Sequence, residues 1–319
     1  MKELFKKIIL DFHENGIPEV IPRDIKIPLD SKKIISVIGP RRAGKTYLFY
    51  QVISQIKDIT DVIYINCEDE RFTLKKENLQ EIIDAYLELY PSKKHPYIFL
   101  DEIQEINGWE KFVRRIYDTI THNIFITGSS AKLLSTDIAT SLRGRTLTYN
   151  LFPLSFREFL SFNKVELKNM TSSGQQALIK NNFQKYIDMG SFPELSIIEK
   201  QFHERMIKDY TSTMLLRDVI ERYRLQNPTA VHNFFHRCIS NYSKELSVAK
   251  IYNELKSSKV KVSKESVYEF IEHFKEAFIA LPLYKFTTNY AKRELQKIYL
   301  IDTSIANITH FKFSPDYGR

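Results

Sequence analysis

Apolar and polar residues alternate along the first half of the chain in blocks that predict strands separated by helices. Short apolar runs are the predicted strands, at residues 34–38, 62–65, 97–100, 124–126 and 147–151. Apolar residues at helical spacing lie between them, at residues 46–57, 78–90 and 109–121. This alternation indicates α/β architecture, with βαβ units on a largely parallel sheet and helices on both faces. We therefore expect the functional motifs to lie at the carboxyl ends of the strands.

Helical spacing predominates in the rest of the chain. An amphipathic helix is expected at the start, where Leu4, Phe5, Ile8, Ile9 and Phe12 recur at helical spacing. Further helices are predicted at residues 155–162, 175–189, 201–223, 230–242, 246–255 and 263–280, and strands at 281–286 and 296–301. A break at Asn227-Pro228 precedes the last three helices. Their order, followed by a β-ribbon, is that of a winged helix.

Composition indicates a folded protein of about two domains, since the chain has 319 residues, of which 43% are hydrophobic. Its two cysteines, Cys67 and Cys238, lie far apart in the sequence, and neither has other metal-ligating residues at a typical spacing. This is typical of free thiols in a reducing compartment. The first residues lack the long apolar core of a signal peptide. No window approaches the roughly twenty apolar residues of a membrane span, so we predict a cytoplasmic protein without a membrane partner.

Positive charge is concentrated toward the C-terminus. The net charge is +8, and residues 231–319 alone contain 14 basic and 9 acidic residues. Such an excess favours contact with a polyanion in this part of the chain. A solvated, lysine-rich surface is the alternative explanation.

A phosphate-binding loop is the strongest motif. Its residues are Gly39, Pro40, Arg41, Arg42, Ala43, Gly44, Lys45 and Thr46. They match G-x-x-x-x-G-K-[ST] between a predicted strand and a predicted helix. In such a loop the backbone N–H groups surround a phosphate, the lysine reaches the β- and γ-phosphates, and the hydroxyl ligates Mg²⁺. We predict that these residues, with the adjoining Tyr47, bind ATP and Mg²⁺; a structural glycine turn is the alternative.

Two carboxylates follow the third apolar run. Asp101 ends the predicted strand, where it would hold Mg²⁺ opposite Thr46. Glu102 is placed to polarise the water that attacks the γ-phosphate. A solvated strand end would explain these residues alone, but the upstream loop favours the catalytic interpretation. Adjacent Asp and Glu also indicate an ATPase instead of a GTPase.

Small polar residues end the fourth apolar run. Thr127 and Ser129 are candidates to hydrogen-bond the γ-phosphate or the attacking water, and Ser129 is our predicted catalytic residue. The alternative is an N-cap, because a helix is expected from Ala131 onward.

Two arginines precede the fifth predicted strand. Arg143 and Arg145 flank Gly144 and could reach a neighbouring subunit's γ-phosphate as arginine fingers. A phosphate ligand within the same chain and a plain surface pair are the alternatives. Action on a neighbour would require a homo-oligomer.

These motifs occur in an order that resembles a widespread bacterial and archaeal family of predicted AAA+-type ATPases. The matching segments are residues 39–46, 99–104, 127–130, 142–145 and 152–159, the last of which begins Phe152-Pro153-Leu154. The similarity extends through residues 190–194, 216–219 and 297–303 and so covers nearly the whole chain. In that family the ATPase core is followed by a helical lid, a winged-helix-like domain and often a nuclease-like fold.

The resemblance implies three parts in this chain: an ATPase core with its N-terminal helix at residues 1–154, a helical lid at 155–227 and a winged-helix-like domain at 228–319. Arg217 and Arg222 become candidates for a lid arginine that contacts the γ-phosphate. Gly190-Ser191 replaces the family's usual double glycine. The sequence ends at Arg319, about where a nuclease-like part would begin, so we predict no nuclease activity.

The favoured function is Mg²⁺-dependent ATP binding and hydrolysis that drives a conformational change on DNA. The expected DNA contacts come from the third helix and the wing of the C-terminal domain: Lys259, Lys261, Lys264, Ser266, Lys292 and Arg293. The alternative is a nucleotide-dependent signalling switch whose C-terminal half binds a protein partner. That alternative takes support from Glu265, Glu269, Glu272 and Glu276 on the same helix.

Overall fold

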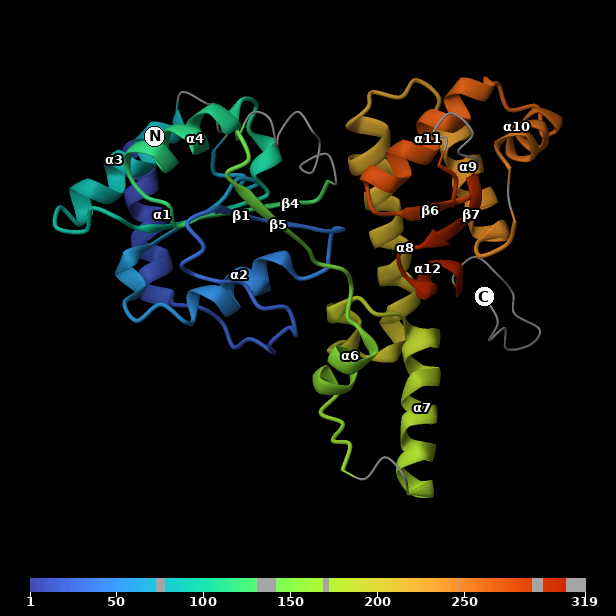
Figure 1. Ribbon diagram of the computed structural model, residues 1–319, viewed down its shortest axis with the longest axis horizontal. Helices are drawn as coiled ribbons and strands as arrows, with labels where there is room; N and C mark the ends of the chain where they lie inside the picture. The colour runs from blue at the N-terminus through green and yellow to red at the C-terminus, as the bar shows by residue number, and fades with distance from the viewer. Residues whose placement is uncertain (73–77, 131–141, 169–171, 246, 289–294, 308–319) are drawn as a thin grey trace. The chain divides into compact units, whose positions relative to one another are not determined.

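The computed structural model describes residues 1–72, 78–130, 142–168, 172–245, 247–288 and 295–307 (Figure 1). Its contacts divide the chain into two compact units. The first contains Met1–Gly39 and Gly44–Leu151, and the second contains Pro40–Ala43 and Phe152–Arg319. Four residues of the phosphate loop therefore group with the second unit.

A parallel sheet forms the centre of the first unit. Its strands are β1 (Ile34–Ile38), β2 (Val62–Asn66), β3 (Tyr97–Asp101), β4 (Ile124–Gly128) and β5 (Thr146–Asn150). They lie in the order β2-β3-β4-β1-β5, and each pair of neighbours is parallel. Every residue of β1 and β4 is buried, which explains why both strands are almost uninterrupted apolar runs. The predicted α/β fold is confirmed.

Helices cover both faces of this sheet (Figure 1). They are α1 (Lys2–Asn15), α2 (Lys45–Ile53), α3 (Leu79–Leu89) and α4 (Trp109–Thr119). Crossovers between parallel strands are right-handed. The connection from β1 to β2 runs across the sheet in the opposite direction to those from β2 to β3 and from β3 to β4. As a result, α2 lies on one face, where Leu48 and Phe49 pack against Val37, while α3 and α4 lie on the other.

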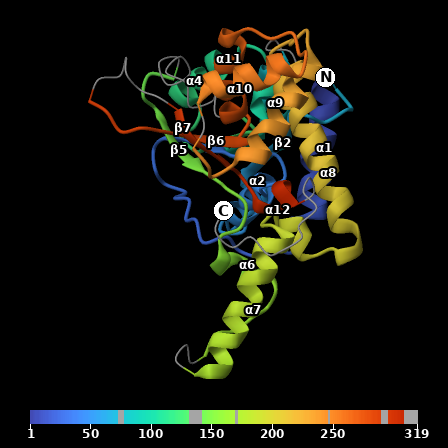
Figure 2. The ribbon, with the colours of Figure 1, turned by 90° about the vertical axis from the view of Figure 1, so that its right-hand side faces the viewer.

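The second unit is mostly helical (Figures 1 and 2). Its first elements are α6 (Phe156–Phe162), α7 (Ser173–Met189), the short helices η5 (Pro193–Ser196) and η6 (Lys200–Phe202), α8 (His203–Thr213) and the π-helix η7 (Met214–Glu221). Next come α9 (Pro228–Asn241), α10 (Val248–Ser257), α11 (Lys264–Glu276), β6 (Ala280–Tyr284), β7 (Leu295–Leu300) and α12 (Thr303–Asn307). The strands β6 and β7 are antiparallel.

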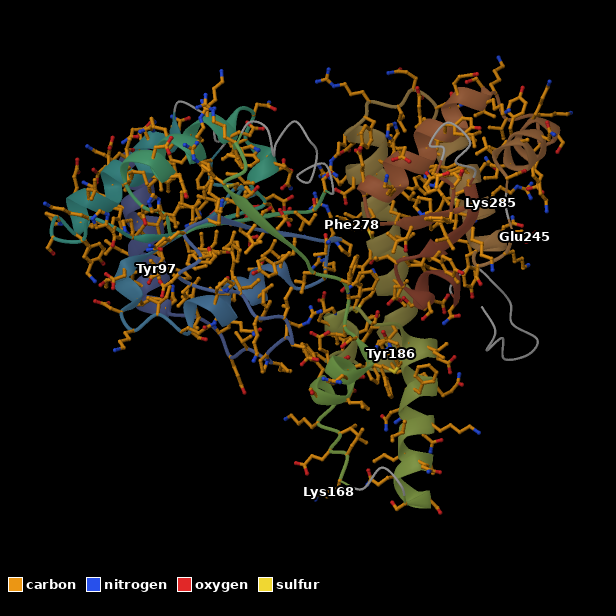
Figure 3. All side chains as sticks on the ribbon, viewed as in Figure 1. Tyr97, Lys168, Tyr186, Glu245, Phe278 and Lys285 are labelled. Atoms are coloured by element: carbon orange, nitrogen blue, oxygen red, sulfur yellow. The ribbon has the colours of Figure 1, made fainter. Side chains whose placement is uncertain are left out.

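Side-chain caps set the starts of several of these helices. Ser155 accepts from the Glu158 backbone N–H while the Glu158 carboxylate accepts from the Ser155 N–H, a capping box that starts α6. Asn227 caps α9 in the same way that Ser263 caps α11. Tyr186 of α7 then packs against the rings of α6 and donates to the Leu154 carbonyl oxygen at 2.8 Å (Figure 3).

One predicted helix changes its type along its length, and one predicted helix boundary was wrong. The helix expected at residues 201–223 contains α8 and then the wider turns of η7. The helix expected at residues 263–280 ends at Glu276, and Ala280 already begins β6. Apolar residues run through this boundary, so periodicity gives no stop signal; the chain turns at Phe278, whose φ is +55°, and β6 then pairs with β7.

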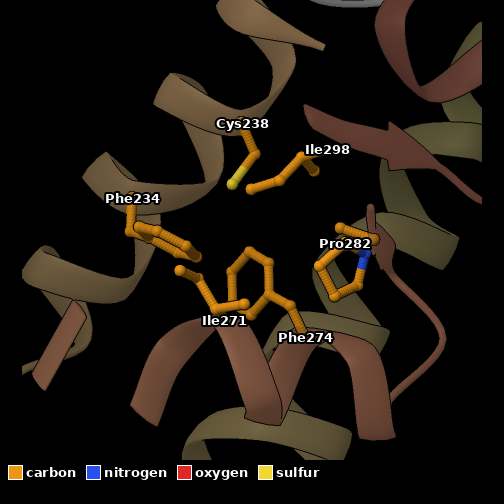
Figure 4. A pocket seen from close by; sticks show the side chains of 7 residues that line it. Phe234, Cys238, Ile271, Phe274, Pro282 and Ile298 are labelled. Atoms are coloured by element: carbon orange, nitrogen blue, oxygen red, sulfur yellow. The ribbon is translucent and has the colours of Figure 1, made fainter. Parts of the chain in front are cut away.

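One cluster of buried side chains joins most of the second unit. It contains Phe192 and Leu215 as well as Phe234 and Phe274, which come from both sides of the predicted domain boundary at residue 227. Figure 4 shows Phe234, Cys238 and Ile298 facing one another within this core. Their side chains leave no space for a water-sized molecule, so this region is packed interior. The division at residue 227 stays a prediction.

Among the described residues, no helix is both long and apolar enough to cross a membrane.

Candidate functional site

The geometry of the loop between β1 and α2 requires its two glycines. A Cβ atom on Gly39 would overlap the carbonyl oxygen of Leu151. Gly44 caps the start of α2 with φ +92°, a backbone conformation that favours glycine. Arg42 also has a positive φ, +65°. The backbone therefore turns sharply before it enters α2 at Lys45.

Lys45 is buried and already has oxygen partners. Its side chain leaves α2 at the first position, and the residue is 5% exposed. The Nζ atom lies 3.2 Å from the Gly39 carbonyl oxygen and 3.0 Å from Oε1 of Glu102. The fold thus brings the lysine of the loop into direct contact with the glutamate after β3. Two residues that act on the same phosphate must be this close together.

Asp101, at the end of β3, is surrounded by hydroxyl groups. Thr46 donates to its Oδ2 atom at 2.6 Å, and Tyr64 of β2 donates to the same oxygen at 3.1 Å. The hydroxyl of Thr127 donates to the other oxygen, Oδ1. Burial, followed by the negative charge of Glu102, raises the pKa of Asp101, while the hydroxyls of Thr127 and Thr46 and the charge of Lys45 oppose the rise. Thr46 and Asp101 present the adjacent oxygen ligands that Mg²⁺ prefers.

Glu102 occupies a strained position directly after β3. Its φ of +52° is uncommon for a residue with a side chain, and such strain is often found at functional sites. Its backbone N–H donates to Thr127 Oγ1 at 2.8 Å. Its Oε2 atom accepts from Nε2 of Gln104 at 2.7 Å. The carboxylate is therefore held from two sides, by Lys45 and by Gln104.

Thr127 and Ser129, at the end of β4, are both buried. Thr127 links the two acidic residues, because it bonds the Asp101 carboxylate and the Glu102 backbone. Ser129 Oγ lies 3.4 Å from Nε2 of Gln104. The helix expected from Ala131, on which the N-cap alternative depends, lies outside the described residues.

The arginines of the loop contact acidic residues within the second unit. Nε of Arg41 lies 3.1 Å and 3.0 Å from the two carboxylate oxygens of Asp218 in η7. Asp218 also accepts from Arg222 at 2.9 Å. Arg42 lies 3.6 Å from Glu194 and over the ring of Tyr210. Arg222, a candidate from sequence, thus shares a buried carboxylate with Arg41.

Other predicted residues are more exposed. Tyr47 of α2 is 53% exposed and packs its ring edge against Tyr50. The Arg217 side chain is 65% exposed and pairs with Glu221 at 3.4 Å.

The expectation that every motif lies at the carboxyl ends of the strands was wrong for Arg143 and Arg145. These residues precede β5, and the Arg145 carbonyl accepts from the first residue of β1, Ile34. The strands are parallel, so both arginines lie at the amino edge, whereas the loop and Asp101 lie at the carboxyl edge. Arg145 pairs there with Asp118 at 3.0 Å, and Arg143 is exposed.

Two residues at the site were missed from sequence. Tyr64 lies on β2, and its hydroxyl reaches Asp101 only because β2 and β3 are neighbours in the sheet. Gln104 lies two residues after Glu102, within a segment that the family resemblance already included. A polar residue at that spacing was the available signal for Gln104; the sequence carries no such signal for Tyr64.

Comparison with known proteins shows a family match and a shared fold. A family model described as an AAA domain matches residues 31–160, and one described as a domain of unknown function matches residues 180–316. The Walker-type ATPase PABY2304 of Pyrococcus abyssi has the same fold, with a TM-score of 0.56, 14% identity, and coverage of 92% of this chain and 98% of that chain.

The relatives by sequence are uncharacterized. Protein MJ1544 of Methanocaldococcus jannaschii is 39% identical over 100% of this chain and 71% of its own length. A protein of Haemophilus influenzae is 28% identical over 78% of this chain, which spans 61% of that protein. The resemblance inferred from the motifs is confirmed, and the chain belongs to the family of AAA-domain proteins that includes MJ1544.

Proposed function

We propose that this protein binds and hydrolyses ATP with Mg²⁺. The observation that carries the proposal is the direct contact of the loop with the acidic pair: Lys45 with Glu102, and Thr46 with Asp101. Lysine and hydroxyl from a phosphate loop, facing an Asp-Glu pair, form the set that phosphoryl transfer to water requires.

Each side chain has a distinct role in this proposal. Lys45 leaves Glu102 to bind the phosphates, and the N–H groups of the loop with Tyr47 hold the nucleotide. Thr46 and Asp101 hold Mg²⁺, which when bound neutralises charge on the phosphates. Glu102 accepts a proton from the attacking water. Ser129 supports the γ-phosphate or that water from the end of β4.

The test separates binding from turnover. Lys45→Ala should abolish ATP binding, whereas Glu102→Gln should bind ATP with an unchanged Kd and lose hydrolysis by roughly 10²–10⁴-fold, the usual contribution of a general base. Lys57→Ala, at an exposed lysine of the first unit, is the control and should do neither. Full hydrolysis by the Glu102→Gln protein would remove Glu102 from the mechanism.

We propose further that Arg143 or Arg145 acts on a neighbouring subunit. Support comes from their place at the edge of the sheet away from the loop and from the exposure of Arg143. Mixing Arg143→Ala protein with Lys45→Ala protein should restore activity, since mixed oligomers contain intact sites. No recovery with either arginine variant would argue against action in trans.

The second unit is proposed to contain a helical lid up to residue 227 and a DNA-binding winged helix after it. The order α9, α10, α11, β6, β7 supports this, as do exposed Lys259, Lys261 and Lys264 near the start of α11. Lys292 and Arg293 lie outside the described residues. The double variant Lys261→Glu/Lys264→Glu should weaken salt-dependent DNA binding. Lys180→Glu/Lys185→Glu, with the same charge change on α7, should not.

A protein partner is the second candidate for this unit. The observation that favours it is the pair of exposed carboxylates Glu265 and Glu269 on α11, which would repel DNA phosphates. Absence of DNA binding by the wild-type protein at low salt would support the partner-binding switch over the DNA-dependent ATPase.

A further inference from the structure

Gln104 contacts both Glu102 and Ser129, the two residues proposed to act at the γ-phosphate. It belongs to the short helix η3 (Ile103–Glu105), which begins directly after Glu102. Its Nε2 atom donates to Oε2 of Glu102 at 2.7 Å and lies 3.4 Å from Oγ of Ser129. Gln104 therefore bridges Glu102, the proposed general base directly after β3, and Ser129, directly after β4.

The oxygen atom of this amide, Oε1, is the other polar end of the Gln104 side chain. Oε1 of Gln104 is buried and has no hydrogen-bond partner among the residues that the structure describes. Buried acceptors are nearly always paired, because an unpaired one loses its hydration without compensation. An unpaired buried acceptor beside Glu102 thus points to a donor that arrives with the reaction.

Chemistry determines which end of the amide faces Glu102. An ionised carboxylate only accepts hydrogen bonds, so the amide must present its NH₂ group to Glu102. This leaves Oε1 as the acceptor that has no donor among the described residues. A water molecule is a suitable donor, since its second hydrogen can be directed at the Glu102 carboxylate.

We propose that Gln104 positions the attacking water: its Nε2 group holds the Glu102 carboxylate, and its Oε1 atom accepts a hydrogen bond from the water. This inference rests on the proposed ATPase function. In the step, the water oxygen forms a bond to the γ-phosphorus as the bond from that phosphorus to the β,γ-bridging oxygen breaks. One water proton passes to Glu102, and the bridging electron pair leaves on ADP, so ATP and water give ADP, phosphate and a proton.

The test uses two variants of the full chain with different losses. Gln104→Met keeps the side-chain volume and removes both the NH₂ donor and the oxygen acceptor of the amide. Gln104→Glu keeps an oxygen acceptor but replaces the NH₂ donor with a second carboxylate oxygen, which repels Glu102. We expect both to bind ATP with a Kd within about twofold of wild type. Their single-turnover rate constants should fall roughly 100-fold, the effect of a small misplacement of a reacting group.

Gln80→Leu is the matched control. Gln80 also donates its amide to a carboxylate, Asp84 at 2.7 Å, but on the surface of the first unit. Its loss should change neither the Kd nor the rate constant. A merely structural role of Gln104 would lower the thermal midpoint and the ATP affinity together, instead of lowering the rate constant alone.

The possible failures are distinguishable. A wild-type rate constant in Gln104→Met overturns the water-positioning role while the ATPase proposal stands. A wild-type rate constant in Gln104→Glu alone overturns the donor role of Nε2. If the wild-type protein binds ATP but does not hydrolyse it, the proposed function fails, and the role of Gln104 fails with it.

Discussion

Asp218 offers a direct test of how the second unit holds the arginine of the loop. Its side chain is 1% exposed, and it accepts hydrogen bonds from Arg41 and Arg222 at about the same distance, 3.0 Å and 2.9 Å. It lies in the π-helix η7, a rare conformation that is frequent at functional sites. Asp218→Asn keeps the shape of this side chain and removes its negative charge.

The magnitude follows from the burial of the three groups. Removing one partner of a buried ion pair typically costs about 3–5 kcal/mol. The side chains of Arg41 and Arg222 are 21% and 19% exposed, so solvent offsets part of the loss, and the Asn carbonyl still accepts a hydrogen bond. We therefore expect the free energy of unfolding to fall by about 2–3 kcal/mol. For a unit of this size the thermal midpoint should fall by roughly 5–10 °C.

Urea unfolding followed by far-UV circular dichroism measures this change. Fluorescence of Trp109, the single tryptophan, follows the first unit separately. Glu221→Gln is the matched control on the same helix, because Glu221 pairs with Arg217 at the surface and should contribute no more than about 0.5 kcal/mol. If both variants lose the same free energy within about 0.5 kcal/mol, the reasoning about the buried carboxylate is wrong.

Two further predictions concern stability. Gly190→Ala would make the new Cβ overlap the Asp302 carboxylate at a φ of +89°, so we expect a loss of at least about 2 kcal/mol in urea unfolding. Gly174→Ala, where nothing lies within 4 Å of the new Cβ, should be neutral or stabilising, and the reverse order would contradict the steric argument. Burial lowers the pKa of His13 below its usual 6.5, so the unfolded chain binds more protons just below that pH. Stability should therefore be complete above about pH 6.5 and fall as the pH decreases; His13→Gln should flatten this dependence of the urea midpoint, and a wild-type midpoint equal at pH 5.5 and 7.5 would contradict it.

The sequence alone determined the sheet, the loop and the acidic pair. Each depends on residues that are close in the chain. The most buried strands, β1, β3 and β4, appear as apolar runs because both faces of the sheet are covered there, whereas no residue of β5 is fully buried. The loop is recognisable because glycine, lysine and threonine must occur at set distances within eight residues. The acidic pair Asp101 and Glu102 is predictable because two residues that are adjacent at the end of a strand both lie at the edge of the sheet.

Only the tertiary structure decided which distant residues join this site. Tyr64 reaches Asp101 through the pairing of β2 with β3, and Asp218 reaches Arg41 across 177 positions of the chain. The tertiary structure also places Arg145 at the amino edge of the sheet, whereas we expected its motif at the carboxyl edge. Local periodicity reports which face of an element is buried, whereas strand order and helix packing determine which side chains meet there. Those contacts depend on the whole fold, and a short motif does not contain them.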